Sequence, residues 1–473
     1  MHLPPAFSHG WRDAEVYEEV EDLSWSSPSL TIVLASVHAF LYLSFLLLTF
    51  RPAFTLFHLF LATQTVAFVL RPILSAADGG FSLYGGPLAF YNEGLFLNLL
   101  ANFLVALGYL AVYARRHPKA SQPYRYSRSS LLKGTWISFA LGLTALALIH
   151  FLSGGAWLPN ARGEAITRVV PFGKVLFPLA VIPFSFSLAS GALLVFFTLR
   201  EAKSPRPKNF VGLLFLLLVS LTSAIALVVL YQRGFLLVAL LVALFFVVRL
   251  HNWGYIRLML VALLSLVLLT QIRPTAQLIA NLLSGEAPSA PVNIEEQPPF
   301  LQRHFLYSPN FDTVDVWPIV RSYIADNGYK GGSTFLAVPL RFFPPSLRLE
   351  YGLLTAVDEL NAYHWGNVYW EKSFGFNVTL VQEAYLNFGL LGFILLPLAG
   401  MLGAWLDQWL WTLSLLTTTR MYGVFAVFQM GIPTGEVGGI AQWALAYLFT
   451  GFFVGVLSSL SLRVSTHGKY ERR

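Results

Sequence analysis

FVGLLFLLLVSLTSAIALVVL, residues 210–230, is the stretch that decides the fold, and it contains no charged residue. About 20 apolar residues in an α-helix cross the ~30 Å hydrocarbon core of a bilayer. A helix on the surface of a soluble protein keeps one polar face, and this stretch has none. It therefore predicts a membrane-spanning helix.

Ten further apolar runs repeat this pattern, so we expect an all-α polytopic membrane protein with about eleven transmembrane helices. In chain order the expected spans are 30–50, 54–74, 88–113, 131–152, 175–199, 210–230, 235–250, 255–272, 384–406, 421–432 and 440–462. The composition agrees, because only 12% of the residues are charged, against about 25% in soluble globular proteins.

The distribution of Lys and Arg predicts the orientation, since cytoplasmic connections are enriched in both. Basic residues gather in connections 114–133 and 200–208 and in the C-terminal tail, which we therefore place in the cytoplasm. The long segment 274–378 carries six Lys or Arg and ten Asp or Glu, which suits the periplasm. We thus expect a protein of the bacterial inner membrane.

The predicted organisation has five parts. They are a periplasmic N-terminal segment (1–28), transmembrane helices one to eight (29–273), a large, partly helical periplasmic loop (274–378), helices nine to eleven (379–463) and a cytoplasmic tail (464–473). The first helix lacks a preceding basic region and a cleavage site, so we expect it to be retained.

Several classes of function are disfavoured by composition and motifs. The net charge of +7 lies in connections that would contact anionic lipid, so it indicates membrane lipids and not nucleic acid as partner. The chain has no cysteine, and no metal-ligand spacing or nucleotide-binding glycine motif is present. We expect no metal and no cofactor.

The large loop mixes aromatic side chains with charged ones over residues 307–377. Aromatic rings can stack on sugar faces while polar groups bind the hydroxyls, so the mixture fits a glycan site. The alternative is a folded cap whose aromatic residues form its own core and interface belt. The aromatic residues that we select as glycan contacts are Trp317, Trp365 and Tyr363.

Three segments carry a resemblance to a known family. They are GGST at Gly331–Thr334, PLRFFPP at Pro339–Pro345 and TLVQEAYLNFG at Thr379–Gly389. Together they resemble the O-antigen polymerase (Wzy-type) family, which has a glycine-rich stretch, a proline-arginine segment and an E-x-Y-x-N-F-G signature entering a helix. The helix number and the position of the large loop match across most of the chain.

The resemblance implies a glycosyltransferase. Such an enzyme transfers a growing glycan from undecaprenyl pyrophosphate to a lipid-linked repeat unit at the outer face of the membrane, and a chain-length regulator is a further expected partner. Three alternatives stay open: an O-antigen ligase that uses lipid A core as acceptor, a lipid-oligosaccharide flippase or transporter, and a structural subunit. The E-x-Y-x-N-F-G run favours the polymerase.

Arginines on the outer side are expected to hold the pyrophosphate, because a guanidinium binds phosphate oxygens through paired hydrogen bonds. Arg233 lies in the short turn 231–234, as in the resembled family; the alternative is an arginine that anchors a helix end. Arg71, before Pro72, is a weaker candidate of the same kind.

Other candidate arginines follow from their positions in the outer loops. The family is also described by an R-x10-G pattern, which Arg162 and Arg321 fit, and Arg341 lies in the proline-arginine segment. The spacing alone is no evidence, since Arg420 fits it as well. Location in the outer loops is what supports these arginines.

A carboxylate or histidine is needed to take the proton from the acceptor hydroxyl. Glu383 lies where the large loop re-enters the membrane, and Asn387 shares its helix face four residues later. The alternative for Glu383 is an acid that complements a helix N-terminus. His364 and Asp358 are rival bases, and Tyr385 and Asn387 complete the expected glycan contacts.

Overall fold

The computed structural model describes fourteen parts of the chain. They are residues 25–49, 55–80, 82–114, 125–153, 173–201, 210–230, 232–251, 302–306, 312–339, 351–352, 354–366, 368–369, 375–430 and 435–470. The expected eighth span, 255–272, and most of the first half of the large loop lie outside the described residues.

The described residues are almost entirely helical, which confirms the all-α prediction. The helices are α1 (Pro28–Leu48), α2 (Leu56–Thr65), η4 (Val66–Leu70), α3 (Arg71–Ala77), α4 (Leu88–Tyr113), α5 (Arg128–Leu152), α7 (Gly173–Glu201), α8 (Phe210–Val229), α9 (Arg233–His251), η6 (Gln302–Leu306), α11 (Trp317–Asn327), α12 (Ser333–Leu336), α14 (Ala356–Trp365), α16 (Leu380–Phe388), η8 (Gly389–Leu395), α17 (Leu396–Thr412), α18 (Thr418–Met430) and α19 (Val437–Tyr470). Two short strands, β1 (Arg125–Tyr126) and β2 (Leu415–Leu416), pair in parallel.

Eight helical stretches of the described chain are long and apolar enough to cross a membrane. They are Pro28–Leu48, Leu56–Ala77, Leu88–Tyr113, Arg128–Leu152, Val175–Arg200, Val211–Val229, Leu380–Thr412 and Val437–Ser459. Each matches an expected span, so a multi-pass membrane protein is confirmed. Two further expected spans form the shorter helices α9 and α18, and the count of eleven is not confirmed.

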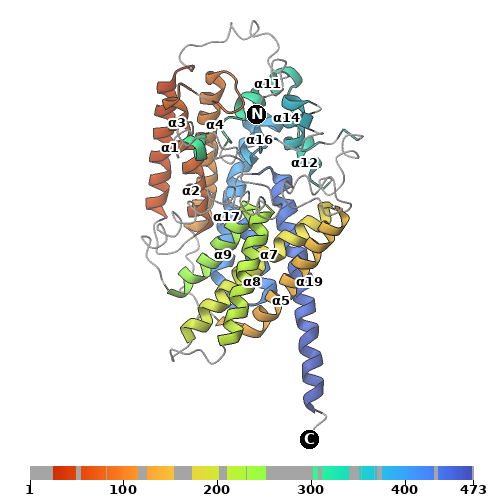
Figure 1. The fold of residues 1–473 in the computed structure, drawn as a ribbon. Helices are drawn as coiled ribbons and strands as arrows, with labels where there is room; N and C mark the ends of the chain where they lie inside the picture. The colour runs from red at the N-terminus through yellow and green to blue at the C-terminus, as the bar shows by residue number, and fades with distance from the viewer. Residues whose placement is uncertain are drawn as a thin grey trace, which may run out of the picture.

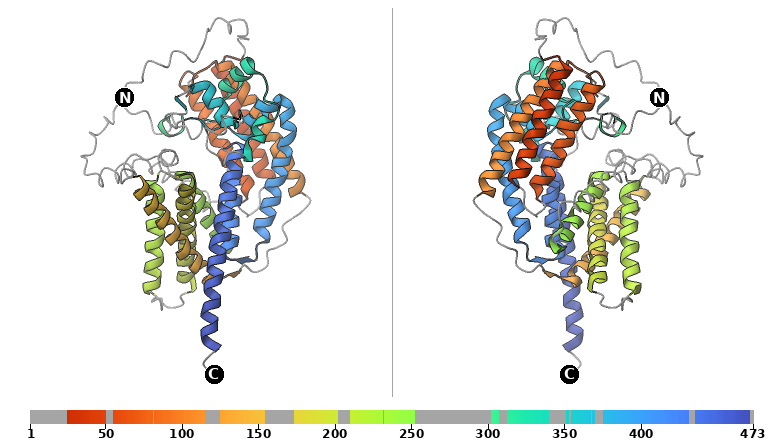
Figure 2. Two further views of the ribbon diagram at one scale, coloured as in Figure 1. Left: turned by 90° about the vertical axis from the view of Figure 1, so that its right-hand side faces the viewer. Right: turned by 90° about the vertical axis from the view of Figure 1, so that its left-hand side faces the viewer.

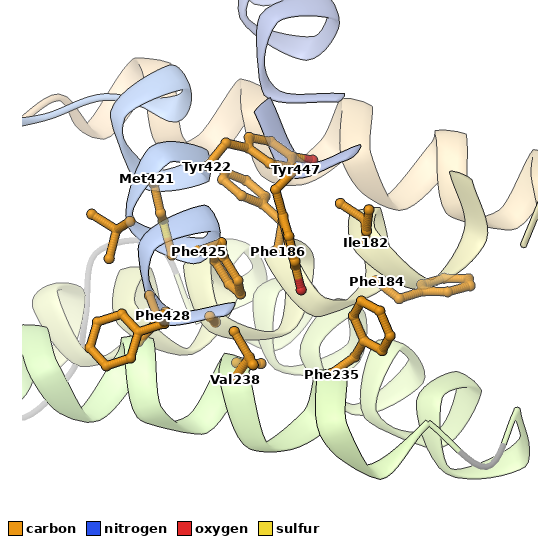
Figure 3. Packing of buried hydrophobic residues seen from close by; sticks show 14 of the residues in the cluster. Ile182, Phe184, Phe186, Phe235, Val238, Met421, Tyr422, Phe425, Phe428 and Tyr447 are labelled. Atoms are coloured by element: carbon orange, nitrogen blue, oxygen red, sulfur yellow. The ribbon is translucent and has the colours of Figure 1, made fainter. Parts of the chain in front are cut away.

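The membrane-spanning helices form two groups (Figures 1 and 2). In the first group, α1 packs against α2, η4, α3 and α4, and α17 packs along α4. In the second, α7 packs against α5, α8 and α9, and α18 and α19 join them. Figure 3 shows the aromatic core of the second group, where the rings of Phe186 and Tyr422 stack at 4.2 Å between centroids.

A small cap formed by the second half of the large loop covers one end of the first group. Its helices α11 and α14 lie at the top of Figure 1, beside the outer ends of α4 and α16. The start of α1 lies at the same end, because the Asn92 side chain donates to the carbonyl of Trp25 at 2.8 Å. The loop and the beginning of the chain's first helix therefore share one end of the molecule.

The described ends of the basic connections 114–133 and 200–208 lie at the opposite end. Arg128, which begins α5, donates to the hydroxyl of Thr198 near the end of α7 at 3.3 Å. β1 and β2 join the beginning of α5 to the end of α17 there. This separation of the acidic loop from the basic connections is the arrangement that the sequence predicts.

Candidate functional site

Two of the three segments that carry the family resemblance, the glycine-rich stretch and Thr379–Gly389, meet in one buried hydrogen-bonded unit. Nearly all of the third, Pro339–Pro345, lies outside the described residues. The Thr334 hydroxyl donates to Glu383 Oε1 at 3.0 Å, and Asn387 Nδ2 donates to the Thr334 hydroxyl at 2.6 Å. Asn387 Oδ1 accepts from the backbone N–H of Gly332 at 3.0 Å. The glycine-rich turn is thus held on the face of α16 that Glu383 and Asn387 share.

Local sequence explains why α16 presents this face. Thr379 caps the helix, and its side chain and that of Gln382 form a reciprocal capping box. Gly389 ends the helix with a φ of +58°, a backbone conformation that favours glycine. Thr379 and Gln382, which precede the E-x-Y-x-N-F-G signature, and the final glycine of the signature therefore delimit a helix of nine residues.

Glu383 also joins α16 to α19. Its Oε2 accepts from the backbone N–H of Val437, the first residue of α19, at 2.8 Å. A carboxylate is favourable at a helix N-terminus, because the unpaired N–H groups there carry partial positive charge. Glu383 is fully buried and both its oxygens accept hydrogen bonds. This arrangement corresponds to the alternative role of Glu383, an acid that complements a helix N-terminus.

A second carboxylate repeats this arrangement. Glu436 is buried, and its Oε2 accepts from the backbone N–H of Val357 near the start of α14 at 2.7 Å. Glu383 and Glu436 thus connect the cap, α16 and α19 through backbone N–H groups at helix starts.

A partly exposed ionic cluster lies beside this unit. Arg321 of α11 forms an ion pair with Glu93 of α4, with 3.0 Å between Nε and Oε2, and about a third of each side chain is exposed (31% and 30%). Arg321 Nη1 donates to the hydroxyl of Tyr385, the tyrosine of the signature, at 2.8 Å. The guanidinium lies over the Phe90 ring at 5.9 Å. Cation, carboxylate and phenol therefore meet at an accessible edge of the cap.

Sequence reasoning selected Arg321 and Tyr385 but missed Glu93. The signal was present, because Glu93 is the only charged residue in the apolar span 88–113. An ionisable residue within a membrane span is a functional candidate by default.

Further polar groups extend from this cluster across the cap. Lys330 forms an ion pair with Glu359 at 2.8 Å, and the Tyr323 hydroxyl donates to the same carboxylate at 2.9 Å. Burial lowers the pKa of Lys330, but its hydrogen bonds to Glu359 and Tyr323 outweigh this and raise the pKa above the ordinary value. The exposed Tyr363 donates to Asp326 at 2.6 Å.

The other predicted bases occupy less accessible places. Asp358 is buried and accepts hydrogen bonds from the hydroxyls of Thr355 and Tyr369 at 3.1 and 2.9 Å. His364 packs edge-on against Trp365 at 4.5 Å between ring centroids. Burial lowers the pKa of His364 to about 4, so its imidazole is neutral and weakly basic at pH 7.

Among the predicted glycan contacts, Trp317 and Tyr385 belong to the core under the cap. Trp317 is fully buried and packs edge-on against Tyr385 at 5.3 Å. It presents no face to a ligand in this structure. Asn387 is also buried, whereas Trp365 is half-buried and Tyr363 exposed.

Arg71 lies in a buried polar cluster below the cap. Its Nε donates to Asp315 at 2.6 Å and its Nη1 to the carbonyl of Phe305 at 2.6 Å. The Tyr84 hydroxyl donates to the neighbouring Asp312. Burial raises the pKa of Asp312 to about 7. Arg71 thus attaches the large loop to α3 and is not exposed.

The remaining predicted arginines cannot be placed in the same way. Arg162 and Arg341 lie outside the described residues, and Arg233 begins α9 without a described side chain.

No group of three or more His, Cys, Asp or Glu that could hold a metal ion occurs in the described parts of the chain. Comparisons of the chain with protein-family models, curated proteins and solved structures find no match.

Proposed function

We propose that the chain is a surface-polysaccharide polymerase of the O-antigen (Wzy) type, a glycosyltransferase of the bacterial inner membrane. It transfers a growing glycan from undecaprenyl pyrophosphate to a lipid-linked repeat unit at the periplasmic face. One observation carries the proposal. The signature helix α16, whose Glu383 and Asn387 bind the glycine-rich turn, places Tyr385 against the partly exposed Arg321–Glu93 pair.

Arg321 is assigned to the pyrophosphate. A guanidinium stays charged and binds phosphate oxygens through a planar set of donors. Stabilising the charge on a leaving pyrophosphate lowers the barrier of the transfer step. Arg162, Arg233 and Arg341 remain proposed contacts of the same group.

Glu93 is assigned as the base in place of Glu383, because Glu93 is accessible and Glu383 is fully buried. The bond between the anomeric carbon and the pyrophosphate oxygen breaks, and the pyrophosphate keeps the electron pair. A new bond forms between this carbon and the acceptor hydroxyl oxygen, whose proton passes to the Glu93 carboxylate.

The proposal is tested with purified protein and lipid-linked repeat units, with product ladders read on a gel. Glu93→Gln is expected to lower turnover about 100-fold, the scale of general-base removal. Arg321→Ala is expected to abolish ladders, and Arg321→Lys to restore them in part, because lysine lacks the planar fork. Asp78→Asn is the matched control, because Asp78 is an exposed carboxylate at the C-terminal end of α3. This variant is expected to keep the normal rate.

Three results would contradict the proposal. Normal ladders from Glu93→Gln and Arg321→Ala would show that the cluster only stabilises the cap. Transfer to lipid A core in place of lipid-linked repeat units would identify a ligase. Absence of both transfers from the unchanged protein would exclude both enzymes.

A further inference from the structure

A cavity of about 360 Å³ lies within the membrane-spanning part, where α2, α4 and α17 meet the beginning of α19. Its wall is mostly apolar and includes Phe57, Phe60, Val105, Leu402 and Ile440. Leu402, which belongs to this wall, is also 51% exposed. The volume is within the range of ~300–1,000 Å³ typical of small-molecule sites.

A chain of hydrogen bonds runs from α1 through α4 to this cavity. The Leu95 carbonyl at one end fixes which group donates and which accepts in each of these bonds. His38 Nε2 lies 3.0 Å from the carbonyl of Leu95, which can only accept, so Nε2 carries the proton. In a neutral imidazole Nδ1 then accepts, and the Tyr42 hydroxyl donates to it at 2.8 Å. Tyr42 must in turn accept from Asn102 Nδ2, at 2.7 Å.

The same direction continues to the cavity wall. Asn102 Nδ2 donates its second proton to Gln64 Oε1 at 3.2 Å. Gln64 is therefore oriented with Nε2 away from Asn102, and Nε2 forms no hydrogen bond with a described residue. Gln64 is 7% exposed and lines the cavity. The chain of bonds thus presents an amide donor to an apolar space.

Two acceptors lie in the same wall. Asn98 donates through Nδ2 to the carbonyl of Gly94 at 2.7 Å, and Asn102 uses both protons of its Nδ2. The side-chain oxygens of Asn98 and Asn102 accept no hydrogen bond from any described residue, and both residues line the cavity. A buried amide group without a partner costs free energy, so a ligand that both donates and accepts is favoured.

We propose that this cavity binds a long-chain fatty acid in its neutral form. Its carbonyl oxygen accepts from Gln64 Nε2 and its hydroxyl donates to the side-chain oxygen of Asn98 or Asn102, while the hydrocarbon chain fills the apolar remainder. None of the described residues that line the cavity is charged, so a phosphate head group would find no counter-charge among them. An isoprenoid chain offers no hydrogen-bonding oxygen to the three amides. The inference does not rest on the proposed glycosyl transfer.

The test uses the full chain in nanodiscs of phosphatidylethanolamine and phosphatidylglycerol, with oleic acid as the probe. Native mass spectrometry is expected to show about one tightly held oleic acid per chain. Gln64→Leu, which keeps the size but removes the donor, is expected to weaken binding roughly 3- to 10-fold, the equivalent of one hydrogen bond. Methyl oleate, which cannot donate, should bind more weakly than the acid.

Two substitutions of Gly403, one small and one large, test whether oleic acid binding depends on the volume of the cavity. A Cβ at Gly403 would meet nothing nearer than a Tyr109 ring atom at 3.9 Å, so Gly403→Ala should bind oleic acid normally. Gly403→Leu projects into the cavity and should lower binding at least tenfold. Three outcomes would overturn the proposal: no saturable oleic acid binding, equal binding by all variants, or a phospholipid or polyprenyl lipid as the molecule retained.

Discussion

At the scale of single residues, the carboxylates of Glu383 and Glu93 have different surroundings in the structure. Glu383 accepts from Thr334 and from the backbone of Val437 and is fully buried. Glu93 is partly exposed and pairs with Arg321. Because a base must reach the proton that it removes, the accessible carboxylate is the better candidate, and the buried one connects α16 to α19.

Asp312 provides a prediction about pH. Burial raises its pKa to about 7, so between its unfolded pKa and pH 7 the folded protein binds the proton more tightly than the unfolded chain. The stability that this group contributes is therefore present below about pH 4 and lost as pH rises through about 7. Thermal unfolding in detergent between pH 5 and 8 should show a falling midpoint.

Asp312→Asn isolates this effect, because an amide accepts from Tyr84 but does not titrate in this range. The difference in midpoint between the unchanged protein and Asp312→Asn should shift steadily with pH in favour of the variant. A difference that is constant from pH 5 to 8 would contradict the raised pKa.

At the scale of elements, glycines decide how closely α4 and α17 approach. A Cβ at Gly400 would collide with the backbone of Val105, and one at Gly108 would collide with the backbone of Pro397. Small residues allow such close approach, and packing of this kind stabilises helix pairs in a bilayer. The contact also positions α17 beside the cavity that Gly403 lines.

We predict that Gly400→Ala destabilises the protein by about 1–3 kcal/mol, the usual cost of overpacking. Gly403→Ala lies one turn further along α17 and has room for the methyl group, so it should be neutral or slightly stabilising. Unfolding midpoints in one detergent provide the comparison. Equal midpoints for the two variants would mean that α4 and α17 separate freely.

At the scale of the whole molecule, the cap and the basic connections lie at opposite ends of the helices. α11 and α14 cover the end where α4 begins, and α19 continues beyond the second group toward the other end (Figure 1). Under the positive-inside rule, the end that holds Arg125 and Arg128 faces the cytoplasm. We therefore propose that the cap faces the periplasm, as the proposed reaction requires.

Cysteine labelling tests this orientation directly, because the chain has no cysteine of its own. Tyr351→Cys lies in the cap region at a side chain that is 70% exposed and should react with an impermeant maleimide in intact spheroplasts. Thr412→Cys, exposed at the other end of α17, should react only after lysis. Labelling of Thr412→Cys and protection of Tyr351→Cys in intact spheroplasts would invert the proposed orientation.

The sequence by itself determined the membrane class, eight of the spans and the separation of the acidic loop from the basic connections. These properties depend on the hydropathy and charge of contiguous residues, which are local. It also selected Arg321 and Tyr385 as candidate site residues, but gave no means of ranking Glu383, His364 and Asp358 as the base.

Only the tertiary structure decided which polar groups meet. Arg71 and Asp315, 244 residues apart, form a buried pair, and Asp407 accepts from the backbone N–H of Leu56 across 351 residues. The pairing of Glu93 with Arg321 and the orientation of Gln64 at the cavity likewise depend on contacts between segments that are distant in the sequence. Burial and hydrogen-bond partners arise from helix packing between distant segments, and no periodicity or spacing within one segment encodes them.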